Sequence, residues 1–160
     1  MWIHHCVITT PYGRQSDTLS YKFMNLKQTI SVQVYYEDTD HSGVVYHANY
    51  LKYIERGRTE HLRELGFELV TIANESGLVF VVKSVKADYL LPAFLDDTIE
   101  VQTSIELVKH ASLIFTQKIT NIEKNTVLFN AEVKVVSVLK NNLKPCAFPQ
   151  EILEKLNGRK

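Results

Sequence analysis

The stretch YYEDTDHSGVVYHANY, residues 35–50, decides the fold of this chain. Before it, apolar and polar residues alternate, which is typical of a strand with one buried face, and we expect a strand over residues 28–36. After it, apolar and small residues recur at helical spacing, which predicts an amphipathic helix over residues 49–65. The acidic turn therefore joins a strand to a long helix.

The acidic side chains of this turn are Glu37, Asp38 and Asp40. Negative groups just before a helix interact favourably with the partial positive charge at its N-terminus, so simple capping is one interpretation. A cap, however, needs only one short polar residue, and Asn49 can supply it. Three acids, the glycine at Gly43 and an adjacent Tyr-His pair exceed that need, which favours a chemical role for the turn.

The motif EDTDHSGVVYHANY, residues 37–50, and its continuation YIERGR, residues 53–58, closely resemble the signature of hotdog-fold acyl-CoA thioesterases. The resemblance is to the 4-hydroxybenzoyl-CoA thioesterase superfamily and, within it, to the Tol-Pal-associated acyl-CoA thioesterase branch. A second block, residues 80–97, contains FVVKS, YLLPA and a pair of aspartates, and is similar to the same family. The likeness covers about residues 28–145.

Four runs with strand character follow the predicted helix, and no other long helix is expected. They cover residues 78–91, 99–107, 112–120 and 127–135, with a short C-terminal helix at 149–156. One strand, one long helix and four successive strands predict an α+β fold with an antiparallel sheet. The resemblance adds the name hotdog, a five-stranded antiparallel sheet wrapped around the central helix. Gly57 inside this helix predicts a close contact with the sheet.

The composition excludes several classes of protein. A chain of 160 residues is one domain's worth, and its 18 basic and 18 acidic residues cancel, so we expect no nucleic-acid partner. No apolar run approaches the ~20 residues of a membrane span. Cys6 and Cys146 make no disulfide framework, which favours the cytoplasm. His4 and His5 beside Cys6 lack a second ligand cluster, so we expect no metal and no cofactor.

The first residues of the chain lie outside the resemblance. Residues 1–23 lack a clear period and show no signal-peptide pattern, and we expect a poorly ordered or expression-derived extension. Met24 could be the natural start. Residues 24–160 then form a single hotdog thioesterase domain.

The chemistry that the resemblance implies is thioester hydrolysis. A thiol with a pKa near ~8.5 leaves readily, so one carboxylate and one oxyanion donor can suffice. The family's catalytic aspartate is the second acid of the Asp-x-Asp pair, which falls on Asp40, as nucleophile or as general base for water. The family's oxyanion donor is a backbone N–H at the helix start, which falls on His47. The alternative for this histidine is packing on Tyr50 or Leu51.

Two further acids have structural interpretations. Asp38 is expected to tie N–H groups of the loop, as an Asx turn does. Glu55 lies on the helix that carries the catalytic acid in some related hotdog enzymes. We favour instead an ion pair of Glu55 with Arg56 or Arg58, since such pairs are common on helices.

The substrate contacts that we expect are Tyr46, Lys83 and Ser84. The strand at residues 78–91 is too apolar for a bare sheet edge, so we expect it to pair with a second copy across a two-fold axis. The protein would then be a homodimer or homotetramer, with Lys83 and Ser84 of one subunit near the Asp40 loop of the other. The weaker candidates for binding the nucleotide end of CoA are Lys83, Lys86, Lys109 and His110.

Two alternatives to an acyl-CoA thioesterase remain open. A hotdog dehydratase usually pairs a catalytic histidine with a more distant acid and has a Gly-Pro-rich helix entrance, and the Asp-Thr-Asp motif argues against it. A non-catalytic module could bind an acyl ligand or an acyl carrier protein, which we also keep as a partner. Binding alone needs no carboxylate beside a thioester carbonyl, so Asp40 argues against this module.

Overall fold

The computed structural model describes residues 27–156, so the predicted extension 1–23 and the cluster at residues 4–6 lie outside it. The elements in chain order are β1 (Gln28–Gln33), the 3-10 helix η1 (Tyr36–Asp38), α1 (Asn49–Glu64), α2 (Leu69–Glu75), β2 (Leu78–Tyr89), β3 (Thr98–Lys109), β4 (Ser112–Asn121), β5 (Thr126–Leu139) and α3 (Gln150–Leu156).

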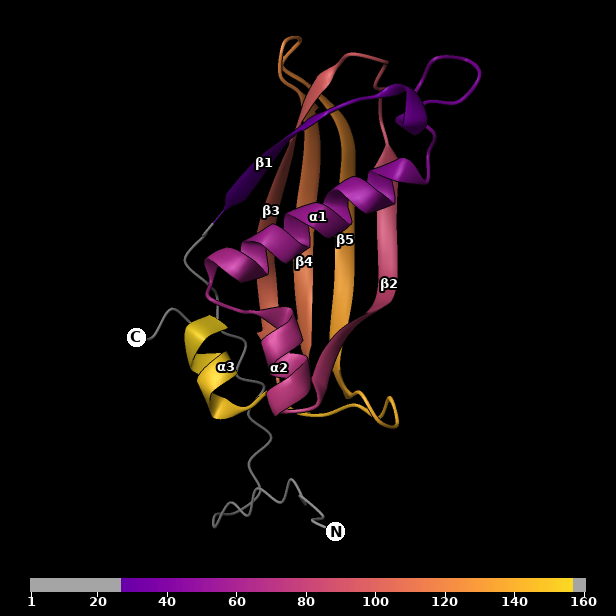
Figure 1. Cartoon of the computed structure of the whole chain (residues 1–160). Helices are drawn as coiled ribbons and strands as arrows, with labels where there is room; N and C mark the ends of the chain where they lie inside the picture. Colours follow the sequence, from indigo (N-terminus) through magenta and orange to yellow (C-terminus); the bar gives the residue numbers. More distant parts are fainter. Residues whose placement is uncertain (1–26, 157–160) are drawn as a thin grey trace, which may run out of the picture.

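The five strands form one antiparallel sheet in the order β1-β3-β4-β5-β2. Figure 1 shows α1 lying obliquely across one face of this sheet, with α2 and α3 beside its C-terminal end. The predicted α+β hotdog architecture is confirmed, and β2 lies at an edge of the sheet as expected. The opposite edge is β1.

The helix α1 touches the sheet most closely at Gly57. A Cβ atom at this position would lie 2.6 Å from Thr103 Oγ1 and 3.1 Å from both Gln117 Nε2 and Val101 Cγ1. Such a distance to Thr103 is shorter than real Cβ contacts, so any side chain larger than hydrogen would push the helix from the sheet. The close contact predicted from this glycine is therefore confirmed.

A buried polar network locks the helix onto β4. Gln117 Nε2 donates to the Ile54 carbonyl at 2.7 Å and to Thr103 Oγ1 at 2.8 Å, while its Oε1 accepts from Arg58 Nη1 at 2.8 Å. Arg58 is buried, and burial lowers its pKa, an effect that the charge of Glu55 partly offsets. The prediction that Glu55 forms an ion pair with Arg56 or Arg58 is wrong, because the described residues show no such pair. Glu55 Oε1 instead accepts a hydrogen bond from Thr59 Oγ1 at 2.8 Å.

Several element ends differ from the prediction, and one helix was not predicted. The first strand ends at Gln33 rather than at residue 36, because Tyr36–Asp38 turns into a 3-10 helix. The segment Leu69–Glu75 forms α2, a helix that was not predicted; it has only seven residues, none of them fully buried, although Leu69 and Ile72 pack against the core.

Candidate active site

The acidic turn forms a very short hairpin in front of α1. Thr39 and Val45 form an isolated bridge, and the Asp40 N–H donates to the Val44 carbonyl at 2.9 Å. The Gly43 N–H donates a hydrogen bond to the Asp40 carbonyl at 3.0 Å. Gly43 has a φ of +76°, a backbone conformation that glycine adopts readily. The glycine of the motif therefore closes the turn that presents Asp40.

The Asp40 side chain is exposed and only partly engaged. Its Oδ1 atom accepts a hydrogen bond from the Ser42 N–H at 2.7 Å, which fixes the plane of the carboxylate. Oδ2 receives no hydrogen bond from residues 27–156. One carboxylate oxygen is thus oriented by the loop, and the other can reach a water molecule or a substrate carbonyl.

The neighbouring Asp38 is buried and holds the turn against the helix. Its carboxylate accepts from the Tyr35 N–H at 3.0 Å, and its backbone carbonyl accepts both the Tyr46 N–H at 2.9 Å and Asn49 Nδ2 at 2.8 Å. The structural role expected of Asp38 is confirmed, but its carboxylate binds an N–H three residues earlier rather than forming an Asx turn, which Asp40 forms with Ser42. The capping interpretation is wrong, since the N-cap residue is Ala48, without a side-chain cap, and Asn49 binds Asp38 instead.

N–H groups at the start of α1 are left unpaired. The Asn49 N–H donates to the Tyr46 carbonyl and the Leu51 N–H to the Ala48 carbonyl. Within the described part of the chain, neither the His47 N–H nor the Ala48 N–H donates to any acceptor. Unpaired N–H groups at a helix start favour negative charge, so this turn can bind an oxyanion.

Aromatic side chains line the helix start. The His47 imidazole lies 4.4 Å from the Tyr46 ring and 6.4 Å from the Tyr89 ring, measured between centroids. Tyr89 also packs on Tyr50 and Phe129, at 5.4 and 5.0 Å. The Tyr89 hydroxyl donates to the His47 carbonyl at 3.0 Å, a contact that no sequence pattern indicated.

Two tyrosines behind the turn stay protonated. Burial, and to a smaller degree the neighbouring Asp38 carboxylate, raise the pKa of Tyr53, whose hydroxyl is buried. Burial also raises the pKa of Tyr50, whose hydroxyl accepts the Ala93 N–H at 2.9 Å. Neither phenol can serve as a base near neutral pH, whereas the Asp40 carboxylate is exposed.

The predicted site residues fall into two groups. Asp40, Tyr46 and His47 lie together in the turn and at the helix start. Lys83 and Ser84 lie on the edge strand β2 at a register shift, and both are exposed. Ser84 is five residues from Tyr89, about 16 Å along a strand, so one chain does not bring Lys83 and Ser84 to Asp40.

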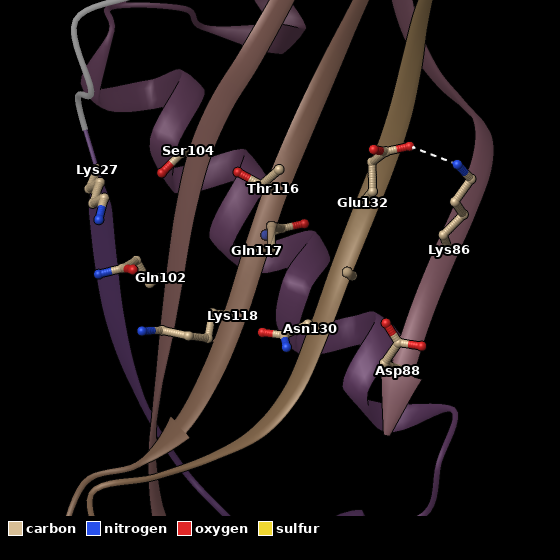
Figure 2. A pocket seen from close by; sticks show the side chains of 11 residues that line it. Lys27, Lys86, Asp88, Gln102, Ser104, Thr116, Gln117, Lys118, Asn130 and Glu132 are labelled. Carbon is tan, nitrogen blue, oxygen red and sulfur yellow. Dashed lines mark ion pairs between the residues drawn. The ribbon is translucent and has the colours of Figure 1, made fainter. Parts of the chain in front are cut away.

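A hollow of about 470 Å³ lies on the other face of the sheet. Figure 2 shows most of its side chains on the face opposite α1, where Lys86 forms an ion pair with Glu132 at 3.5 Å, whereas the Gln117 side chain is hydrogen-bonded to α1. The residues that line it are Lys27, Lys86, Asp88, Gln102, Ser104, Thr116, Gln117, Lys118, Asn130, Ala131 and Glu132. Charges of both signs and the lack of aromatic side chains make this hollow unsuited to an acyl chain.

Residues 27–156 contain neither a membrane-spanning helix nor a metal-binding cluster. None of the helices found there is long and apolar enough to cross a membrane. Nor do three or more His, Cys, Asp or Glu side chains in that part of the chain gather as metal ligands would.

Known proteins show the family of this chain. The profile of the Thioesterase-like superfamily matches residues 34–156. Acyl-CoA thioesterase YbgC of Haemophilus influenzae is 48% identical over 122 residues, which cover 76% of this chain and 88% of the relative. Acyl-CoA thioesterase YbgC of Helicobacter pylori (strain 26695) is 39% identical over 133 residues, which cover 79% of this chain and 97% of the relative. The chain belongs to the Thioesterase-like superfamily, which confirms the family resemblance, and the YbgC relatives agree with the expected branch.

Solved structures support the same fold. A probable thioesterase from Bartonella henselae matches with a TM-score of 0.70 and 35% identity, over 77% of this chain and 99% of that one. The DHNA-CoA thioesterase of Staphylococcus aureus matches with a TM-score of 0.77 over 82% of this chain and 89% of that one. Because the sequence identity is only 21%, this match supports the fold and nothing further.

Proposed function

We propose that this protein hydrolyses acyl-CoA thioesters to free acid and CoA, with Asp40 as nucleophile or general base. The unpaired N–H groups at the start of α1, at and next to His47, would bind the oxyanion that develops on the thioester carbonyl. The observation that best supports this proposal is that the exposed Asp40 carboxylate, which is oriented by the Ser42 N–H, lies in the turn that leads directly to these N–H groups.

The class of reaction is supported by the family and by the relatives named acyl-CoA thioesterase or acyl-CoA thioester hydrolase. The site has what such a reaction needs, namely a carboxylate with one unengaged oxygen and N–H donors at a helix start. Because the proposed donors are backbone groups, the His47 imidazole has no required part in the reaction. The cysteine content still favours a cytoplasmic location.

The protein would act as a homodimer or homotetramer with shared sites. The edge strand β2 exposes 39% of Val81, 46% of Val82 and 40% of Val85, an apolar edge that pairing with a second copy would cover. Across a two-fold axis, Lys83 and Ser84 of one subunit would approach the Asp40 turn of the other and contact substrate together with Tyr46.

The test is turnover of a panel of acyl-CoA substrates by Asp40→Asn. We expect a loss of at least about 10²-fold in kcat with unchanged folding, the scale of a lost catalytic base. Glu37→Gln is the matched control, since Glu37 is an exposed acid of the same turn with no hydrogen bond through its side chain among the described residues. His47→Ala should be milder than Asp40→Asn.

Near-normal turnover by folded Asp40→Asn would refute the assignment of Asp40. Complete loss in folded His47→Ala would mean that the imidazole takes part. A wild-type protein that binds acyl-CoA or acyl carrier protein without turnover would instead support the non-catalytic module.

A further inference from the structure

The Tyr89 hydroxyl makes a bond that links the sheet edge to the start of the central helix. Tyr89 is the last residue of β2, and it donates to the His47 carbonyl, 42 positions earlier in the chain, at 3.0 Å. No backbone N–H of the described residues uses this carbonyl, because the Leu51 N–H, one helical turn on, donates to Ala48 at 3.2 Å. Tyr89 is therefore the one donor that the described chain provides for the His47 carbonyl.

This bond acts on the peptide unit that carries an unpaired N–H. The His47 carbonyl and the Ala48 N–H belong to the same peptide plane, and in a trans peptide they point in opposite directions. Because the hydrogen bond holds the His47 carbonyl toward the sheet edge, the Ala48 N–H points away from the sheet edge. A hydrogen bond to the carbonyl oxygen also polarises the amide, which makes its N–H a better donor.

We propose that Tyr89 is a positioning residue for thioester hydrolysis, which orients and polarises the 47–48 peptide so that its N–H binds the oxyanion. The inference rests on the proposed function. Tyr89 would not touch the reacting atoms, and its effect reaches the substrate through the backbone amide of Ala48.

The hydroxyl can be removed without disturbing the packing. The Tyr89 ring lies against Phe129 at 5.0 Å and Tyr50 at 5.4 Å, and phenylalanine would keep both contacts. Tyr50 cannot replace the lost donor, because its own hydroxyl is engaged with the Ala93 N–H. Tyr89→Phe therefore isolates the hydrogen bond from the rest of the site.

The experiment compares wild-type protein, Tyr89→Phe and the control Tyr36→Phe, an exposed tyrosine whose side chain makes no hydrogen bond with the described residues. We expect kcat of Tyr89→Phe to fall roughly tenfold, the scale of one hydrogen bond, with KM within about twofold and Tm unchanged. In ¹⁵N-labelled protein without substrate, the Ala48 amide resonance should shift in Tyr89→Phe and stay in place in Tyr36→Phe.

Three results would overturn the inference. An unchanged kcat, or an unmoved Ala48 resonance, would show that the bond does not act on the donor. A joint fall of kcat and Tm with a rise in KM would show a structural role only. An inactive wild-type protein would overturn the proposed function itself, whereas active wild type with fully active Tyr89→Phe overturns only the role of Tyr89.

Discussion

Replacing Gly57 with alanine tests the contact that fixes α1 on the sheet. The added Cβ would lie 2.6 Å from Thr103 Oγ1, and Thr103 and Gln117 are both buried, so neither can move freely. Overpacking of this kind costs about 1–3 kcal/mol. A displaced Gln117 would also lose buried hydrogen bonds to Ile54, Thr103 and Arg58, and a buried polar group left unpaired costs about 1–3 kcal/mol. The higher helix propensity of alanine over glycine stabilises the helix by only about 1 kcal/mol, which offsets part of this loss.

The balance predicts a loss of about 2–3 kcal/mol in the free energy of unfolding. For a domain of this size that loss lowers Tm by roughly 5–10 °C, which calorimetry or circular dichroism can measure. Lys52→Ala, on the exposed side of α1, is the control and should change Tm little. In a Thr103→Ala background, Gly57→Ala should cost less, since the nearest atom is gone. A Tm of Gly57→Ala equal to or above that of wild type would refute the reasoning.

Three further predictions concern other parts of the chain. Burial lowers the pKa of His61 below its usual 6.5, so between the two pKa values the folded state binds fewer protons than the unfolded state. Tm should therefore fall as the pH drops from above 6.5 through the folded pKa. The fall should be less steep in His61→Gln. Val82→Lys on the β2 edge should shift sedimentation toward the monomer and lower activity. The control Val70→Lys, at an exposed position of α2, should change neither. A fully active wild-type monomer would contradict the shared site. A chain that begins at Met24 should keep the Tm and activity of the full chain, and a drop of more than a few degrees would contradict the dispensable extension.

Local patterns predicted most of the fold because they report directly on burial. The alternation in residues 99–107 became the centre of β3, and the helical spacing after residue 49 became α1. The pattern failed where side chains act against it. Tyr36 continues the apolar alternation, yet the Asp38 carboxylate binds the Tyr35 N–H and the chain turns into η1.

The sequence alone was enough to locate the candidate site, because the acids, the glycine and the helix start are contiguous in residues 37–50 and need no distant partner to meet. The tertiary structure decided what crosses between elements. Arg58, expected as one of two possible ion-pair partners of Glu55, is buried against Gln117, 59 positions away. Tyr89, an ordinary strand residue by pattern, reaches the His47 carbonyl. Such contacts depend on strand order and on the angle of α1 across the sheet, and a periodic pattern along one segment carries no information on either.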